Sequence, residues 1–168
     1  MNKLNKNIIL IGMPGCGKTT IGKALSNRLN VEFIDMDWYI EQKCGRTITQ
    51  IFEKGEDYFR QLENEVAKEL GEKKQVIIST GGGVIKNLEN IELLKKNGII
   101  VFIDRPVEDI KKNIETSGRP LLKQGADKIY DLFKERYSIY KECCDFQIIN
   151  NSNVDEAIEK IVKAYEKK

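Results

Sequence analysis

Short apolar runs alternate along the chain with longer segments in which apolar residues recur every three or four positions. Runs rich in Ile, Val and Phe predict buried strands over residues 7–11, 31–34, 76–79, 99–103 and 146–149. Helical spacing predicts helices over residues 19–29, 38–44, 47–54, 58–70, 88–97, 107–115 and 128–142, and from 154 to the end. This alternation predicts an α/β fold with a five-stranded parallel sheet and helices on both faces.

Two helix starts carry capping residues. Thr47 is followed by Gln50, which predicts a capping box, and Asn153 precedes Glu156 in the same spacing. A different signal interrupts residues 117–125, where periodicity is lost and a glycine stands near each end. We therefore expect a single domain over residues 1–168, with a mobile lid at about 112–126 and a substrate-binding helical region at about 38–70.

Composition narrows the class of protein. The 168 residues are 40% hydrophobic and 32% charged, which is typical of one globular domain, and the net charge of +2 predicts no nucleic-acid partner. No apolar stretch approaches the ~20 residues of a membrane span. The four cysteines form no C-x-x-C pair, which favours reduced thiols and a cytoplasmic protein.

The chain has no His, so acid–base chemistry must come from carboxylates, Lys, Tyr, Cys or metal-bound water.

Residues 12–19 read Gly-Met-Pro-Gly-Cys-Gly-Lys-Thr and fit the phosphate-loop pattern G-x-x-x-x-G-K-[ST]. In such a loop the backbone N–H groups surround phosphate oxygens, and the following helix directs its positive end at the same anion. Lys18 is placed to reach the β- and γ-phosphates, and the Thr19 hydroxyl to bind Mg²⁺. The predicted nucleotide contacts of this segment are Gly15, Cys16, Gly17, Lys18, Thr19 and Thr20.

Several classes of protein share this loop. A regulatory GTPase would need N-K-x-D after a later strand and D-x-x-G at the end of the third, but that strand ends Ser79-Thr80-Gly81. The switch class is therefore disfavoured. A binding module without transfer activity, and a kinase for a small hydroxy acid such as gluconate, remain as alternatives.

Asp35 and Asp37 follow the second predicted strand. In an extended segment, residues two apart face the same way, so both carboxylates are expected in one cleft. Asp35 is placed to hold Mg²⁺ through its water shell, and Asp37 to orient an attacking hydroxyl or accept its proton. The alternative is an ordinary acidic start to the helix at residue 38.

The chain as a whole resembles the shikimate kinase family of P-loop proteins. The motifs that carry the resemblance, in order, are residues 12–20, Asp35-Met36-Asp37, Gly45-Arg46-Thr47-Ile48, Ile51-Phe52, Phe59-Arg60, Gly81-Gly82-Gly83, Arg119-Pro120-Leu121-Leu122 and Arg136 with Tyr140. Each motif is weak alone, but their order and spacing are specific.

The resemblance implies ATP-dependent phosphorylation of the 3-hydroxyl of shikimate, on the route to chorismate and the aromatic amino acids. It implies that Asp37 contacts the substrate hydroxyls and that Arg60 and Arg136 hold its carboxylate, since guanidinium pairs with carboxylate bidentately. Without the resemblance, these two arginines would be read as solvated helix faces. The remaining substrate contacts that it implies are Gly81, Gly82 and Gly83, which lie against the ring.

The resemblance also assigns the lid arginine and the catalytic set. Arg119 reaches the phosphates and acts with Lys18 and Asp37. Lys112 stands where many members carry an arginine over adenine, and Asn153 with Val154 stands where many carry a proline. We expect Lys112 and Asn153 to contact the nucleotide, with ATP held more by its phosphates than by its base. The implied state is a monomer that binds ATP and shikimate, with Mg²⁺ as cofactor.

Overall fold

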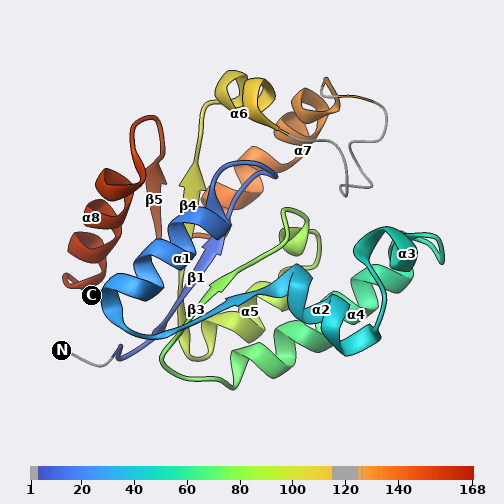
Figure 1. The fold of residues 1–168 in the computed structure, drawn as a ribbon, viewed down its shortest axis with the longest axis horizontal. Helices are drawn as coiled ribbons and strands as arrows, with labels where there is room; N and C mark the ends of the chain where they lie inside the picture. The colour runs from blue at the N-terminus through green and yellow to red at the C-terminus, as the bar shows by residue number, and fades with distance from the viewer. Residues whose placement is uncertain (1–3, 115–124, 126) are drawn as a thin grey trace.

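The computed structural model describes residues 4–114, 125 and 127–168, and it contains a five-stranded sheet in which every pairing is parallel (Figure 1). The strand order is β2-β3-β1-β4-β5. The strands are β1 (Asn7–Ile11), β2 (Glu32–Asp35), β3 (Val76–Ser79), β4 (Gly98–Asp104) and β5 (Phe146–Ile149). The predicted α/β sheet is thus confirmed, and three of the five strands have the predicted bounds.

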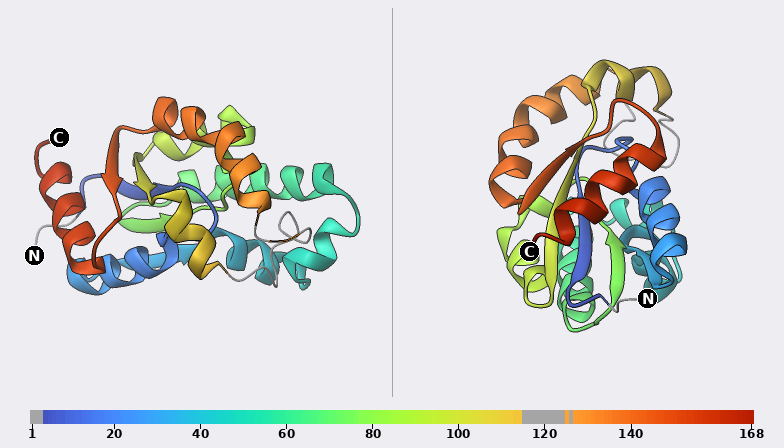
Figure 2. Two further views of the ribbon diagram at one scale, coloured as in Figure 1. Left: turned by 90° about the horizontal axis from the view of Figure 1, so that it is seen from above. Right: turned by 90° about the vertical axis from the view of Figure 1, so that its left-hand side faces the viewer.

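Helices cover both faces of this sheet. In order they are α1 (Lys18–Leu29), α2 (Met36–Cys44), α3 (Ile48–Phe52), α4 (Glu56–Gly71), the 3₁₀ turn η1 (Val84–Lys86), α5 (Leu88–Lys95), α6 (Val107–Asn113), α7 (Lys128–Cys143) and α8 (Val154–Tyr165). Helices α1 and α8 lie on one face, and α5 and α7 lie on the other (Figure 2). Helices α2, α3 and the start of α4 project beyond the β2 edge (Figure 1).

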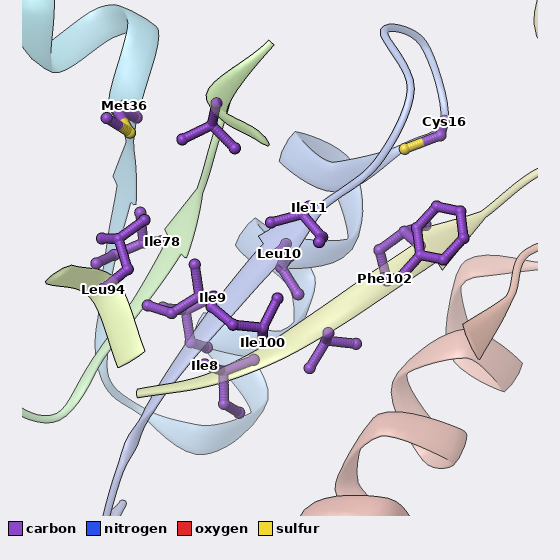
Figure 3. Packing of buried hydrophobic residues seen from close by; sticks show 14 of the residues in the cluster. Ile8, Ile9, Leu10, Ile11, Cys16, Met36, Ile78, Leu94, Ile100 and Phe102 are labelled. Carbon is purple, nitrogen blue, oxygen red and sulfur yellow. The ribbon is translucent and has the colours of Figure 1, made fainter. Parts of the chain in front are cut away.

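The core is centred on β1, whose residues are fully buried. Figure 3 shows β1 side chains such as Ile9 together with Ile78 and Ile100 from the neighbouring strands and Leu94 from α5. A strand buried on both faces reads as a continuous apolar run, which is why its bounds were predictable. This buried strand leads directly into the phosphate loop and gives that loop a rigid base.

Both predicted caps are present. Thr47 Oγ1 accepts from the Gln50 N–H at 3.3 Å, and Gln50 Oε1 accepts from the Thr47 N–H at 2.9 Å. Asn153 Oδ1 accepts from the Glu156 N–H at 2.9 Å. These bonds satisfy backbone donors that a helix start leaves unpaired.

The extended segment predicted at Asp35 and Asp37 is wrong. Asp35 ends β2 and caps α2, because its Oδ1 accepts from the Trp38 N–H at 3.1 Å. Helix α2 therefore begins at Met36, two residues before the predicted start, and Asp37 lies in its first turn. The two carboxylates still reach one cleft, but through a strand-to-helix turn rather than an extended strand.

Two predictions, the lid and the role of Arg119, concern residues that the structure describes only in part or not at all. The predicted lid, apart from residues 112–114 and 125, lies outside the described residues, and so does Arg119. Among the described residues, no helix is both long enough and apolar enough to cross a membrane.

Candidate active site

A cleft of about 380 Å³ opens at the carboxyl ends of the strands, where parallel α/β sheets bind ligands. Its lining combines the loop after β1, the start of α2, helix α4, the turn after β3 and helix α7. The predicted site residues that line it are Gly15, Gly17, Lys18, Thr19, Thr20, Asp35, Asp37, Arg60, Gly81, Gly82, Gly83 and Arg136. Segments up to 122 residues apart, from Pro14 to Arg136, thus meet in one place.

The loop over residues 12–20, called here the phosphate side, depends on left-handed glycines. Gly15 has φ 79° and Gly17 has φ 102°, conformations that other residues rarely adopt. Helix α1 begins at Lys18, so its unpaired N–H groups and positive dipole end belong to this side of the cleft. The geometry is that of an anion site.

Lys18 is 7% exposed, and its ammonium is held by the loop itself. Nζ donates to the Gly12 carbonyl at 2.8 Å and to the Met13 carbonyl at 3.0 Å. A phosphate entering the loop would therefore compete with carbonyls for these protons. Cys16 is fully buried and does not line the cleft, so its predicted contact with the nucleotide stays a prediction.

Thr19 and Asp35 form a pair beside the loop. Thr19 Oγ1 donates to Asp35 Oδ2 at 2.8 Å, and the Ser79 hydroxyl lies 3.4 Å from Thr19 Oγ1. A hydroxyl and a carboxylate next to a phosphate site fit Mg²⁺, which takes oxygen ligands and keeps several waters. Ser79 was not predicted, because a serine at the end of a strand carries no motif.

Asp37 occupies a poorly hydrated position. Its Oδ1 is buried without a hydrogen-bond partner among the described residues, and a β-carbon built on Gly81 would lie 2.9 Å from that oxygen. Burial, and then the nearby charges of Asp35 and Glu63, raise the pKa of Asp37 to about 7. A carboxylate with this pKa is suited to exchanging a proton near neutral pH.

Arg60, Glu63, Gly83 and Arg136 form what we call the acid side of the cleft. Arg60 Nη1 donates to Glu63 Oε2 at 2.8 Å, and Nη2 donates to Glu56 Oε1 at 3.0 Å. A β-carbon on Gly83 would lie 2.3 Å from Arg60 Nη2, so the guanidinium rests against bare backbone. A side chain at this position would therefore force the Arg60 guanidinium to move.

Arg136 is only 1% exposed, although it lines the cleft. Its Nε has no hydrogen-bond partner among the described residues, and the nearest carboxylate oxygen, from Glu135, is 3.8 Å away. A buried guanidinium with an unpaired donor is costly unless an anion completes it. The arrangement favours an anionic ligand and excludes the solvated-face interpretation of Arg136.

Glu63 was missed from the sequence. It is 1% exposed, its Oε1 lacks a partner among the described residues, and burial raises its pKa against the opposing charges of Arg60 and Arg136. Its spacing of three from Arg60 on α4 was the available signal. Tyr140 was part of a motif without an assigned role, and it donates from its hydroxyl to the Gly82 carbonyl, which fixes the glycine turn against α7.

Two predicted nucleotide contacts lie away from the described cleft. The Lys112 side chain is 73% exposed and lies 3.9 Å from Asp109, and Asn153 is exposed at the start of α8. Neither lines the cleft, and their roles stay predictions.

A phosphate loop, a threonine–aspartate pair, an aspartate with a raised pKa and a buried arginine lie in one cleft, and this combination is typical of a P-loop kinase. A sequence model of the family "Shikimate kinase" matches residues 14–166. The chain belongs to the shikimate kinase family.

Individual relatives agree with this assignment. A shikimate kinase from Clostridium botulinum is 52% identical, over 95% of this chain and 97% of that protein. The solved structure of the shikimate kinase from Acinetobacter baumannii in complex with shikimate has a TM-score of 0.92 at 38% identity, covering 98% of this chain and 95% of the other. A gluconokinase from Sinorhizobium meliloti, at 11% identity and TM-score 0.63 over 99% and 94% of the chains, shares the fold alone.

Proposed function

We propose that this protein transfers the γ-phosphoryl group of ATP to the 3-hydroxyl of shikimate. The observation that carries the proposal is the buried Arg136 guanidinium, whose Nε has no partner among the described residues, in the same cleft as a phosphate loop. A phosphate site opposite a buried cation requires an acceptor that is itself an anion. Family membership and the shikimate complex of a 38% identical relative support shikimate as that acceptor.

Asp37 has the central role in the proposed transfer. It lines the cleft between the phosphate side and the acid side, and its pKa of about 7 allows it to take the hydroxyl proton. Arg60 and Arg136 bind the carboxylate, while Gly81, Gly82 and Gly83 let the backbone approach the ring. The acceptor is thus held at one end and activated at the other.

Lys18 and the backbone of Gly15, Cys16, Gly17, Thr19 and Thr20 hold the phosphates of ATP in this proposal. Charge accumulates on the γ-phosphoryl oxygens in the transition state, and Lys18 with Arg119 neutralises it. Thr19 and Asp35 would hold Mg²⁺, which supplies further neutralisation of phosphate charge. Lys112 and Asn153 are assigned to the nucleotide on the family pattern only, and the lid at about 112–126 is assigned to water exclusion.

The proposal also covers the metabolic route, the cellular compartment and the oligomeric state. The reaction belongs to the route to chorismate and the aromatic amino acids. We assign it to the cytoplasm, supported by four free cysteines. We also assign a single-domain monomer, because the exposed large apolar side chains of the described residues are scattered ones: Trp38, Leu88 and Ile149.

An acceptor panel tests this function. ADP release from Mg-ATP is measured with shikimate, quinate, gluconate and nucleoside monophosphates at equal concentrations. Shikimate is expected to give the highest kcat/KM. A preference for gluconate or a nucleotide would overturn the substrate, and nucleotide binding without transfer to any acceptor would overturn the kinase.

A further inference from the structure

Asn150 follows β5 directly, and its side chain contacts the phosphate side. Its Nδ2 donates to the Cys16 carbonyl at 2.9 Å, across 134 residues of sequence. Its backbone N–H donates to the Asp104 carbonyl at 2.7 Å, which extends the β4–β5 ladder by one bond. Asn150 therefore connects the rigid sheet to the loop that follows β1.

The sheet end that carries Asn150 is itself held in place. Asp104 Oδ2 accepts from the Tyr137 hydroxyl at 2.8 Å and from Gln147 Nε2 at 2.6 Å. Three elements, β4, β5 and α7, thus fix the residue to which the Asn150 backbone is bonded. An amide held from a fixed backbone can orient its partner without a large entropic cost.

The carbonyl that Asn150 holds belongs to the peptide between Cys16 and Gly17. In a trans peptide the C=O and the N–H point in opposite directions. A Cys16 carbonyl held toward Asn150 therefore turns the Gly17 N–H away from Asn150, and N–H groups of such loops bind phosphate oxygens. Gly17 has φ 102°, which favours glycine, and a β-carbon there would lie 2.9 Å from Asn150 Nδ2, so it would displace the amide.

We propose that Asn150 is a positioning residue for the nucleotide, which holds the Cys16–Gly17 peptide in its phosphate-binding orientation. It acts through the loop and does not touch the acceptor. The proposal rests on ATP as phosphoryl donor in the proposed function. It predicts a defect confined to the nucleotide, since the hydrogen bonds of Asn150 among the described residues reach Cys16 and Asp104 and not the acid side.

Two substitutions test this role. Asn150→Asp keeps the shape but sets an oxygen against the Cys16 carbonyl and adds a negative charge near the triphosphate, so KM for ATP should rise about 10-fold or more. Asn150→Ala only removes the bond, and KM for ATP should rise about 3–10-fold. In both variants, kcat and KM for shikimate should stay within about 2-fold, which a general structural defect would not produce.

Asn151→Asp is the matched control. It makes the same charge change one residue later at an exposed position, and KM for ATP should change less than about 2-fold. Calorimetric titration of each variant with Mg-ADP measures nucleotide affinity without turnover, and thermal unfolding reports whether each variant is folded. If Asn150→Asp does not fold, the KM for ATP and the Mg-ADP affinity of Asn150→Ala test the proposed role of Asn150.

Three results would overturn the role of Asn150. They are unchanged ADP affinity in the Asn150 variants, an equal rise of both KM values, and an equal defect in Asn151→Asp. Failure of the proposed function would look different, because the wild-type protein would then show no shikimate-dependent ADP release while the titration still compared the variants.

Discussion

The phosphate side comes from one stretch of nine residues, whereas the acid side is collected from α4, the turn after β3 and α7. On the phosphate side the charged group is already satisfied, since Lys18 donates to two loop carbonyls. On the acid side Arg136 Nε and Glu63 Oε1 are buried without partners among the described residues. A nucleotide therefore exchanges existing bonds, while the acid acceptor completes bonds that folding leaves open.

Asp37 lies between the two sides, and its replacement should have the largest effect. Asp37→Asn keeps the shape but cannot accept a proton, so we expect kcat to fall about 10²–10⁴-fold. Shikimate-dependent ADP release measures it. A change of less than about 3-fold would mean that Asp37 positions the acceptor without taking its proton.

Lys18→Met tests the phosphate side. Loss of a cation that faces the transferring group should lower kcat about 10²–10³-fold. Stability should also fall, because the substitution removes two hydrogen bonds to the buried carbonyls of Gly12 and Met13. The control is Lys23→Met on the exposed face of α1, which should retain activity. Near-normal turnover of Lys18→Met would contradict the assignment.

Arg136 tests the acid side through the charge of the acceptor. The wild type should prefer shikimate over its neutral carboxamide by about 10–100-fold in kcat/KM, the worth of a charge-assisted bond of about 1.5–3 kcal/mol. Arg136→Ala should remove most of this preference, although Arg60 can retain part of it.

A double-mutant cycle of two enzymes against two substrates makes the measurement. Arg136→Ala also leaves Glu63 with less positive charge beside it, so its stability must be measured. Arg136→Lys keeps the charge and should recover part of the preference. Equal losses on both substrates would show that Arg136 serves the fold or the nucleotide instead.

Substitutions at two neighbouring glycines, Gly82 and Gly83, test the phosphate side and the acid side of the cleft. A β-carbon on Gly83 would meet Arg60, whereas one on Gly82 would lie 2.8 Å from Pro14 of the phosphate loop. Gly83→Ala should therefore raise KM for shikimate about 10-fold with little change in KM for ATP, whereas Gly82→Ala, whose backbone is also assigned to the ring, should raise KM for ATP about 10-fold as well as KM for shikimate. Steady-state kinetics with each substrate varied will show whether the defects separate, and identical profiles would contradict the division.

The smallest effect concerns stability and pH. The folded-state pKa of Asp37, about 7, lies above its ordinary value of 3.8, so the folded protein binds this proton more tightly than the unfolded chain. The stabilisation is complete below pH 3.8 and is lost as pH rises through about 7. At pH 8, Asp37→Asn should be more stable than wild type by about 1–3 kcal/mol. Urea unfolding of the ligand-free proteins at pH 5 and 8 measures it, and a difference that does not grow with pH would contradict it.

The same division explains what the sequence could predict. Residues 12–20 were predictable because the phosphate site is contiguous and its glycines and lysine have fixed spacing. The extended course of Asp35 and Asp37 was wrong because the Asp35 side chain caps α2 and starts the helix early. Glu63 was not predicted, because the sequence alone does not distinguish a buried acid on a helix from an exposed one. The difference depends on the helix that packs against it. Asn150 was not predicted because its partner lies 134 residues away.

The central place of β1 also governs how the cleft can form during synthesis. Strand β1 is synthesised first, but its two neighbours in the sheet, β3 and β4, come much later in the sequence. Ile11 in β1, for example, pairs with Phe102 in β4. Such long-range pairing folds slowly because distant segments must meet before contacts form. At ribosomal rates of about 5–20 residues per second, β4 is synthesised roughly 5–20 s after β1. A nascent chain that ends before β4 therefore carries the complete phosphate-loop sequence and yet has no nucleotide site.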